Sequence, residues 1–238
     1  MDWLQLAAGQ NQQDAIELLG EIKLGMGTRF SKEAILDVLE RRSATDSKAL
    51  ECLSMMYFGR WGVESDAKAI EYLQRMVDTG NAWANTPLAL VYINNDGELK
   101  DVDRGLKILD DMASADDGSA MCMLGQIYYE GEIVSRDISK AICWLKKAAD
   151  KGIDYAYYVL GYISSEYGHD TDAASWFLKG AARREMNCMD YISECYRYGK
   201  GIGLSDSEAD RWCWEFAEED RMLFYCDECR EREARNRC

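Results

Sequence analysis

The stretch from Ala120 to Gly152 most constrains the fold, because it has the pattern of a complete helix, loop and helix. Small and apolar residues follow the period of an α-helix in both halves of it. They are Ala120, Leu124, Gly125 and Tyr128 in the first half, and Ala141, Trp144, Leu145, Ala148 and Ala149 in the second. Such a hairpin cannot bury its own apolar face, so it needs copies of itself on either side.

The same pattern recurs along the chain, at intervals of 32 to 36 residues. The residues at the first position of each copy are Ala15, Ala49, Ala84, Ala120, Ala156 and Cys188. The copy that begins at Ala15 lacks the aromatic anchors and is degenerate, and the one that begins at Ala156 has a shortened loop. A period of this length predicts a repeat protein made of helical hairpins.

The reference copy has a characteristic set of residues: Leu124, Gly125, Tyr128, Gly131, Val134, Asp137, Lys140, Ala141, Trp144, Ala148, Ala149 and Gly152. This set resembles a known family, the Sel1-like repeat, which is related to the tetratricopeptide repeat (TPR) but has a longer loop inside the hairpin. The resemblance implies an all-α fold, a right-handed α-solenoid of Sel1-like, TPR-like repeats. It also implies that the first helices line a concave surface that binds other proteins.

Three segments are expected on this basis. Residues 1–14 have Trp3, Ala7 and Ala8 at the spacing of the second helix, which predicts the end of a truncated leading repeat that serves as a cap. Residues 15–220 hold about six repeats and are expected to form one solenoid domain. Residues 221–238 lose the pattern and are expected to form a C-terminal capping helix.

Helix ends can be predicted at several places. Gly131 and Gly152 follow helical stretches and are expected to end them, Gly152 in the left-handed conformation. Ser205 stands three residues before Glu208, which is a capping signal. Thr86 before Pro87, the only proline, predicts a helix with Thr86 as N-cap and Pro87 as its first residue.

The cysteines favour reduced thiols. Their number is odd, nine, and they fall at unequal repeat positions, whereas some secreted bacterial Sel1-like proteins tie each hairpin with a disulfide. Cys188 and Cys195 lie about 10 Å apart along one helix, too far for a bond. Small buried hydrophobic residues are the simplest interpretation. The Cys226-x-x-Cys229 pair has ligand spacing but lacks two further ligands, so no metal site is predicted.

Charge and composition narrow the partners. The chain has 28 basic and 43 acidic residues, a formal net charge of −15, which disfavours nucleic acid and favours basic proteins or peptides. Met1-Asp2 lacks the basic start of a signal peptide. No stretch approaches the roughly 18 apolar residues that span a membrane. We therefore expect a soluble, cytoplasmic chain that is monomeric in isolation.

Catalytic chemistry is hard to assemble from these residues. The single histidine, His169, lies in a shortened loop and is expected to be a solvated loop residue rather than part of a Ser-His or Cys-His pair. The glycines at 25, 27, 199, 201 and 203 are explained by hairpin turns rather than by a phosphate loop. No catalytic residue, metal or cofactor is predicted.

The binding surface can be located by elimination, because the first-helix positions not used for packing point the other way. In the C-terminal half these positions are rich in tyrosine and carboxylates, which suits a groove for a basic partner. The predicted partner-binding residues are Gln126, Tyr129, Tyr158, Tyr162, Asp190, Tyr191, Glu194 and Tyr198. The alternative is that several of these tyrosines only pack between adjacent helices.

The sequence favours a protein-binding scaffold or adaptor with no enzymatic activity. Small stand-alone bacterial proteins that resemble this family can instead act as immunity proteins, so an inhibitor of a toxin or enzyme is the first alternative. A hydrolase or other enzyme is the second. The sequence does not decide between an adaptor and an inhibitor.

Overall fold

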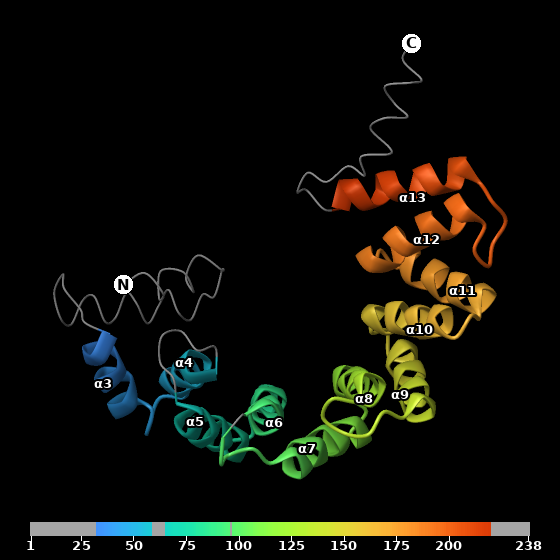
Figure 1. Ribbon diagram of the computed structural model, residues 1–238. Helices are drawn as coiled ribbons and strands as arrows, with labels where there is room; N and C mark the ends of the chain where they lie inside the picture. The colour runs from blue at the N-terminus through green and yellow to red at the C-terminus, as the bar shows by residue number, and fades with distance from the viewer. Residues whose placement is uncertain (1–31, 59–64, 96, 220–238) are drawn as a thin grey trace. The chain divides into compact units, whose positions relative to one another are not determined.

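The computed structural model describes residues 32–58, 65–95 and 97–219. These residues form eleven α-helices, one 3₁₀ helix and no strand (Figure 1). They fall into two compact units, and the boundary lies between Met112 and Ala113. The predicted caps at 1–14 and 221–238 lie outside the described residues, as does the first helix of the copy that begins at Ala15, and the single domain over 15–220 stays a prediction.

The N-terminal unit, called unit 1, contains the second helix of the degenerate copy and two hairpins of helices. Its helices are α3 (Lys32–Arg42), α4 (Ser47–Phe58), α5 (Asp66–Asp78), the 3₁₀ helix η1 (Ala82–Ala84), α6 (Asn85–Asn94) and α7 (Val102–Ser114), whose last two residues belong to the second unit.

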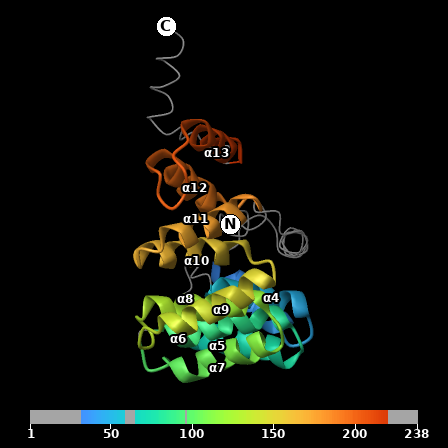
Figure 2. The same ribbon diagram turned by 90° about the vertical axis from the view of Figure 1, so that its right-hand side faces the viewer.

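The C-terminal unit, called unit 2, contains three further hairpins in which each first helix pairs with the helix that follows it. Its helices are α8 (Gly118–Glu130), α9 (Ile138–Asp150), α10 (Asp154–Glu166), α11 (Asp170–Ala181), α12 (Met186–Tyr198) and α13 (Asp206–Glu219). In both ribbon views α10 to α13 lie one above another (Figure 2). This stacking of hairpins is the α-solenoid that the sequence predicted.

Burial confirms the predicted register. The first residues of the described copies are all fully buried: Ala49, Ala84, Ala120, Ala156 and Cys188 are each 0% exposed. The same holds four residues later, where Leu53, Leu88, Leu124, Leu160 and Ile192 are at most 2% exposed. Because both positions face the second helices, one stripe of each first helix supplies the core of its repeat.

Glycines let two hairpins close tightly. A Cβ atom on Gly125 would lie 2.6 Å from Cγ of Leu145, and one on Gly161 would lie 2.5 Å from Cε1 of Phe177. Real Cβ atoms do not approach other carbons this closely, so only glycine allows α8 and α10 to come this close to Leu145 of α9 and Phe177 of α11 at these two points.

Several predicted helix ends are confirmed. Gly131 and Gly152 have φ angles of 73° and 83°, both left-handed, and the N–H of Gly131 donates to the carbonyl of Ile127. Ser205 Oγ accepts from the N–H of Glu208 at 3.3 Å, as the capping signal predicted. Turn chemistry was therefore readable where a single residue type determines it.

The predicted start of α6 is wrong. The helix begins at Asn85 rather than Pro87, and the 3₁₀ helix η1 leads into it, capped by Asn81, whose side chain accepts from the N–H of Trp83. Pro87 is the third helical residue and is buried. Proline is tolerated there because N–H groups of the first turn have no helical partner.

A repeated corner joins each hairpin to the next. The backbone has positive φ at Gly80, Asp116, Gly152 and Arg184, which are 32 to 36 residues apart. Glycine adopts this conformation without strain, whereas arginine does not. Cations also link neighbouring corners, since Lys151 pairs with Asp116 and Arg183 with Asp154.

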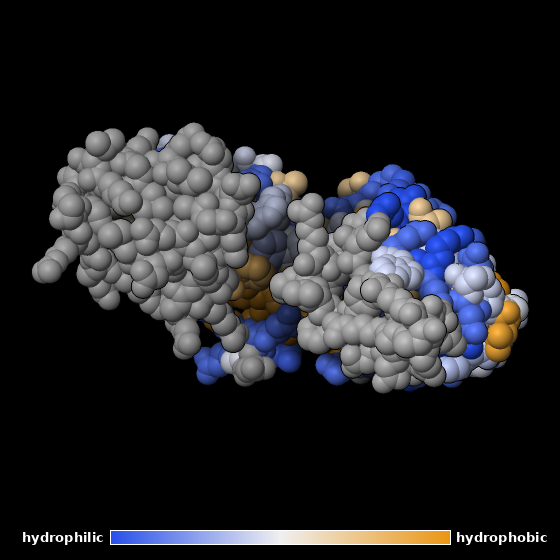
Figure 3. Space-filling view, turned by 90° about the horizontal axis from the view of Figure 1, so that it is seen from above, coloured by the Kyte–Doolittle hydropathy of each residue, from blue (hydrophilic) through white to orange (hydrophobic). Residues whose placement is uncertain are grey.

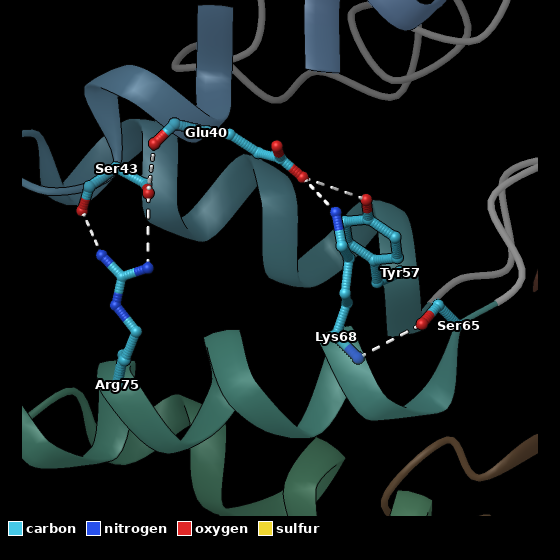
Figure 4. A network of polar contacts seen from close by, with 6 residues as sticks. All are labelled: Glu40, Ser43, Tyr57, Ser65, Lys68 and Arg75. Atoms are coloured by element: carbon cyan, nitrogen blue, oxygen red, sulfur yellow. Dashed lines mark hydrogen bonds and ion pairs between the residues drawn. The ribbon is translucent and has the colours of Figure 1, made fainter. Parts of the chain in front are cut away.

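A polar network ties α3 to the hairpin that follows it in unit 1 (Figure 4). Lys68 pairs with Glu40, and the Tyr57 hydroxyl lies 3.5 Å from the same carboxylate. Arg75 donates to the Ser43 carbonyl at 2.8 Å. The hydrogen bond from Lys68 holds the pKa of Glu40 below its usual value. The degenerate copy is thus held by polar contacts in addition to its apolar ones.

Three of the six cysteines in the described part fit the packing interpretation, whereas Cys143 is exposed and Cys52 and Cys213 are half-buried. Cys122, Cys188 and Cys195 are buried among apolar residues with free thiols. Burial raises the pKa of the Cys122 thiol to about 11 and that of Cys195 to about 11. They behave as small hydrophobic residues.

None of the helices in the described ranges has the length and hydropathy to cross a membrane.

The surface of unit 2 seen in the hydropathy view is mostly hydrophilic. Its coloured atoms are mostly blue or pale, with orange limited to smaller patches (Figure 3).

Candidate functional site

Five tyrosines from three successive first helices form a continuous aromatic surface on unit 2, which we call the tyrosine shelf. Tyr129 comes from α8, Tyr155, Tyr158 and Tyr162 from α10, and Tyr191 from α12. Adjacent ring centroids are 5.4 to 6.3 Å apart. The rings meet in tilted and edge-to-face arrangements, which aromatic pairs prefer.

Three tyrosines share α10 because of helical spacing. Tyr155, Tyr158 and Tyr162 stand three and then four residues apart, so they form one stripe on the helix. Tyr129 meets this stripe edge-on at Tyr162, and Tyr191 meets it at both Tyr158 and Tyr162. The shelf therefore joins three repeats.

The shelf is partly buried and partly open. Tyr155 and Tyr162 are 39% and 40% exposed, and the other three are half-buried. Tyr191 also stacks on the buried Phe177, with centroids 5.0 Å apart. These tyrosines pack between neighbouring helices and still present surface to solvent, so both interpretations of the sequence apply to the same residues.

A hollow of about 120 Å³ lies between α8 and α10 at the edge of the shelf. Seven residues line it: Gln126, Tyr129, Glu130, Tyr155, Tyr158, Val159 and Tyr162. The hollow combines aromatic walls with one carboxylate and one amide, a composition typical of sites that orient a polar group against apolar walls.

Two exposed carboxylates lie at the shelf, Glu130 at the hollow and Glu194 near Tyr191. Asp190 is also exposed, but the charge that acts on it is that of Arg197. Within the described residues, neither Glu130 nor Glu194 makes an ion pair. Their charges therefore act on solvent and on whatever approaches the rings.

Arg136, from the loop after α8, contacts Tyr129 of the shelf and Glu166 at the end of α10, an arrangement we call the clamp. Its guanidinium lies over the Tyr129 ring, 5.0 Å from the centroid, and its Nη2 donates to both oxygens of Glu166 at 2.9 Å. The Tyr129 hydroxyl donates to the same carboxylate at 2.7 Å. The clamp links two repeats and fixes the Tyr129 ring.

The surroundings keep the tyrosine hydroxyls protonated. Burial is the main cause that raises the pKa of Tyr129, Tyr155 and Tyr158, and nearby carboxylates raise it further. Burial likewise raises the pKa of Tyr191 to about 12. The hydrogen bond from Arg136 holds the pKa of Glu166 low. At neutral pH the shelf is uncharged on its rings and negative around them.

The structure brings most of the predicted residues together. Gln126, Tyr129, Tyr158 and Tyr162 line the same hollow, and Tyr191 touches two of these rings. Asp190 and Glu194 lie on the same helix as Tyr191. Tyr198 makes no ring contact with the shelf among the described residues, and Lys200 lies 6.0 Å from its ring centroid.

Two residues of the site were missed by sequence reasoning. Tyr155 and Glu130 line the hollow. Tyr155 precedes the first packing position of its repeat and so was not considered, although its three-residue spacing from Tyr158 places both on one helix face. Glu130 stands at the end of α8, where burial cannot be judged from periodicity.

The described residues include no group of three or more His, Cys, Asp or Glu side chains that could hold a metal ion. The groups that line the hollow are four tyrosines, a valine, an amide and a carboxylate.

Sequence comparisons now identify the repeats. The family model described as Sel1 repeat matches residues 47–81 and 118–153, which are the hairpins α4 to α5 and α8 to α9. An alginate biosynthesis protein, AlgK of Pseudomonas syringae pv. tomato, is 34% identical over 110 residues. The chain contains Sel1 repeats. The match covers 44% of it and 23% of the alginate protein, so the chain spans less than a quarter of that relative.

Solved structures show the same fold. A Sel1 repeat protein from Oxalobacter formigenes aligns with a TM-score of 0.62 and 22% identity over 79% of each chain. The protective antigen c5321 of uropathogenic Escherichia coli aligns with a TM-score of 0.63 and 24% identity over 92% of this chain and 48% of that one. Immunity protein PA5088 of Pseudomonas aeruginosa aligns with a TM-score of 0.53 and 17% identity over 92% and 87%.

Proposed function

We propose that this Sel1-like protein is a scaffold or adaptor that binds a basic segment of a partner protein on the tyrosine shelf. Sel1 repeats are protein-interaction modules, which supports binding in general. The observation that carries the specific proposal is the shelf itself, in which half-exposed tyrosines from three helices are bordered by exposed carboxylates.

Tyrosine suits such an interface because its ring gives large contact area at a low cost in side-chain entropy, and its hydroxyl tolerates water. Rings that are already packed against neighbours lose little freedom on binding, so more of the contact energy is left for affinity. The acidic surroundings and the net charge of −15 would attract a basic partner and speed association.

The test is affinity capture from the native lysate followed by titration of the captured protein against purified variants. The double change Tyr158→Ala and Tyr162→Ala removes the centre of the shelf. Tyr167→Ala is a matched control, because Tyr167 is 50% exposed at the end of the same helix. We expect the control to keep binding and the double variant to lose it, with weaker capture at higher salt.

Equal binding by wild type and by a folded double variant would contradict the proposal. Circular dichroism shows whether the double variant keeps its helices. A capture limited to acidic or uncharged proteins would also contradict the basic character of the partner.

A second candidate function is inhibition of a basic toxin or enzyme. The fold similarity to a protein named as an immunity protein is compatible with it, and the same acidic aromatic surface could occlude a basic active-site cleft. An inhibitor forms a stoichiometric complex that abolishes the partner's activity, whereas an adaptor leaves that activity intact. An activity assay on the captured partner separates the two.

We also propose that the protein acts by binding rather than by catalysis, that it is cytoplasmic and that it is a monomer in isolation. The composition of the hollow supports the first, because rings and one carboxylate bind more readily than they catalyse. Thiol labelling in cells tests the location, since cytoplasmic cysteines remain reduced.

A further inference from the structure

We propose that the hollow between α8 and α10 is a site for one arginine side chain, whose guanidinium lies against the tyrosine rings with the Glu130 carboxylate as counter-charge. This inference rests on the proposed function and adds which residue of the partner the shelf takes.

Aromatic rings surround the hollow. Tyr129, Tyr155, Tyr158 and Tyr162 all line it, and consecutive ring centroids are 5.4 to 6.3 Å apart. Ring faces carry negative charge density that attracts cations within about 6 Å of the centroid. Several rings at one hollow therefore favour a cation over a neutral group of the same shape.

The size of the hollow suits one head group. Its volume is about 120 Å³, and a cavity of about 150 Å³ in another protein holds a benzene molecule. A planar guanidinium at the end of a side chain fits this volume, whereas a helix or a strand of the partner does not.

The residues that line the hollow carry a negative charge and no positive one. Glu130 lines it, and the residues that line it include no lysine or arginine. A cation entering the hollow would therefore gain a counter-charge without displacing one of the protein's own.

The chain already uses this mode of recognition at the Tyr129 ring, which is one of the rings that line the hollow. Arg136 lies 5.0 Å from the Tyr129 centroid while it bonds both oxygens of Glu166. Arginine over tyrosine with a carboxylate in reach is thus a stable arrangement in this surface. The hollow offers the same two components, ring and carboxylate, to a residue from outside.

Arginine fits better than lysine for physical reasons. The guanidinium is planar and weakly hydrated, so it stacks on rings and gives up water at lower cost than an ammonium group. Its fixed donors can bond a carboxylate while the plane remains against a ring.

The test is a titration followed by aromatic NMR on the full chain with labelled tyrosine. The probe is Nα-acetylarginine amide, and Nα-acetylcitrulline amide is its neutral analogue of the same shape. We expect saturable shifts at Tyr155, Tyr158 and Tyr162 with the arginine probe, and binding about ten-fold weaker with citrulline. Equal shifts with both probes, or shifts confined to other tyrosines, would overturn the proposal.

Variants sharpen the test without endangering the fold. Tyr155 is 39% exposed, so Tyr155→Phe keeps the ring and Tyr155→Leu removes it at little structural cost. We expect the first to bind the arginine probe as wild type does and the second about five-fold more weakly. Glu130→Gln should weaken it about three-fold and reduce its salt dependence. Unchanged affinity in Tyr155→Leu would contradict a ring-lined cation site.

The two proposals fail in different ways. Loss of partner binding in the Tyr158→Ala, Tyr162→Ala variant, with no response to the arginine probe, would overturn the arginine site and leave the shelf as an interface. A specific response to arginine, with partner binding intact in that variant, would overturn the proposed function and leave a cation site.

Discussion

The first-helix faces of the two units use equivalent repeat positions for different surfaces. The position six residues after the first buried one is Met55 and Leu90 in unit 1, but Gln126, Tyr162 and Glu194 in unit 2. Met55 and Leu90 are half-buried. Unit 1 therefore presents aliphatic side chains where unit 2 presents an amide, a tyrosine and a carboxylate.

The hollows show the same contrast. Unit 1 has one of about 240 Å³, with Phe58, Leu90 and Val91 on its apolar side and Asp66 and Asn95 on its polar side. Asn95 is buried and donates to Asp66 at 2.8 Å, so the polar groups there are already paired. In unit 2 the hollow is smaller and aromatic, and the Glu130 carboxylate that lines it makes no ion pair with any described residue.

The contrast between the two units shows that the residues that form the core of a repeat differ from those that form its binding surface. The residues at the first position and four residues later are buried to the same extent in both units, whereas the position six residues after the first carries different kinds of side chain in the two units. A repeat can change its surface without changing its core, because the two lie on different stripes of one helix.

The largest expected effect is on the shared framework. Gly125→Leu should destabilise unit 2 by about 3 kcal/mol, because the new side chain would overlap Leu145. Gly105→Leu should do the same to unit 1, where a Cβ would lie 2.6 Å from Cγ1 of Ile93. The measurement is urea unfolding followed by circular dichroism.

Gly203→Leu is the control, since nothing lies within 4 Å of a Cβ built there. An unchanged midpoint for Gly125→Leu would show that the hairpin packing is looser than the structure shows.

The next effect concerns the surfaces alone. Tyr158→Ala with Tyr162→Ala should weaken binding of a basic partner by about 2 kcal/mol, roughly thirty-fold. Met55→Ala with Leu90→Ala, which truncates equivalent side chains in unit 1, should leave that affinity unchanged. Isothermal titration calorimetry measures both. Equal losses from the two pairs would mean that the partner does not distinguish the units.

A smaller effect is expected at the corners between repeats. Arg184 has a φ of 66° where unit 1 has Gly80 with a φ of 85°. Arg184→Gly should therefore stabilise unit 2 by about 0.5–1 kcal/mol by relieving the backbone. Gly80→Arg should destabilise unit 1 by a similar amount, because no atom lies within 4 Å of a Cβ there and only the backbone matters.

Thermal unfolding of the two corner variants shows opposite shifts if the backbone conformation is the cause. A loss of stability in Arg184→Gly would instead show that the arginine side chain contributes more than its backbone conformation costs.

The smallest effect is the pH dependence of the network in unit 1. The pKa of Glu40 is lowered from 4.5 by its hydrogen bond with Lys68, so its contribution is present above that value and is lost as the pH falls below it. Because the Glu40 side chain is 36% exposed, we expect about 0.5 kcal/mol or less.

Urea midpoints measured between about pH 3 and pH 6 test this sign. Glu40→Gln should flatten the acid end of the curve relative to wild type. Glu98→Gln, at an exposed carboxylate, controls for the loss of one charge. An identical slope in Glu40→Gln and wild type would exclude a role for this pair in acid stability.

The fold was predictable because its signals are periodic. Ala120 and Leu124 occupy the same repeat positions as Ala49 and Leu53, and all four are buried, as the predicted register requires. The start of α6 was not predictable in the same way. A single residue, Pro87, is compatible with several first-turn positions, and the preceding 3₁₀ helix depends on Asn81, which carries no periodic signal.

The site was predictable only in part. Helical spacing placed Tyr158 and Tyr162 on one face, and applied one turn earlier it would have included Tyr155. The contact of Tyr191 with α10 depends on how one hairpin stacks on the next, which spacing within a helix does not determine. Arg136 lies in a loop and pairs with Glu166, thirty residues later in the chain. Helical periodicity does not extend into a loop, so the sequence could not predict this pair.

The carboxylates around the tyrosine shelf also affect how copies of the chain behave toward each other. Exposed aromatic surfaces tend to self-associate unless like charges hold them apart. Glu130 and Glu194 supply that repulsion, within a chain whose pI is about 4.6. As the pH approaches this value the net charge vanishes and the rings remain. Solutions of the protein should therefore be most prone to clouding near pH 4.6, and the shelf is the surface on which we expect contacts between molecules to begin.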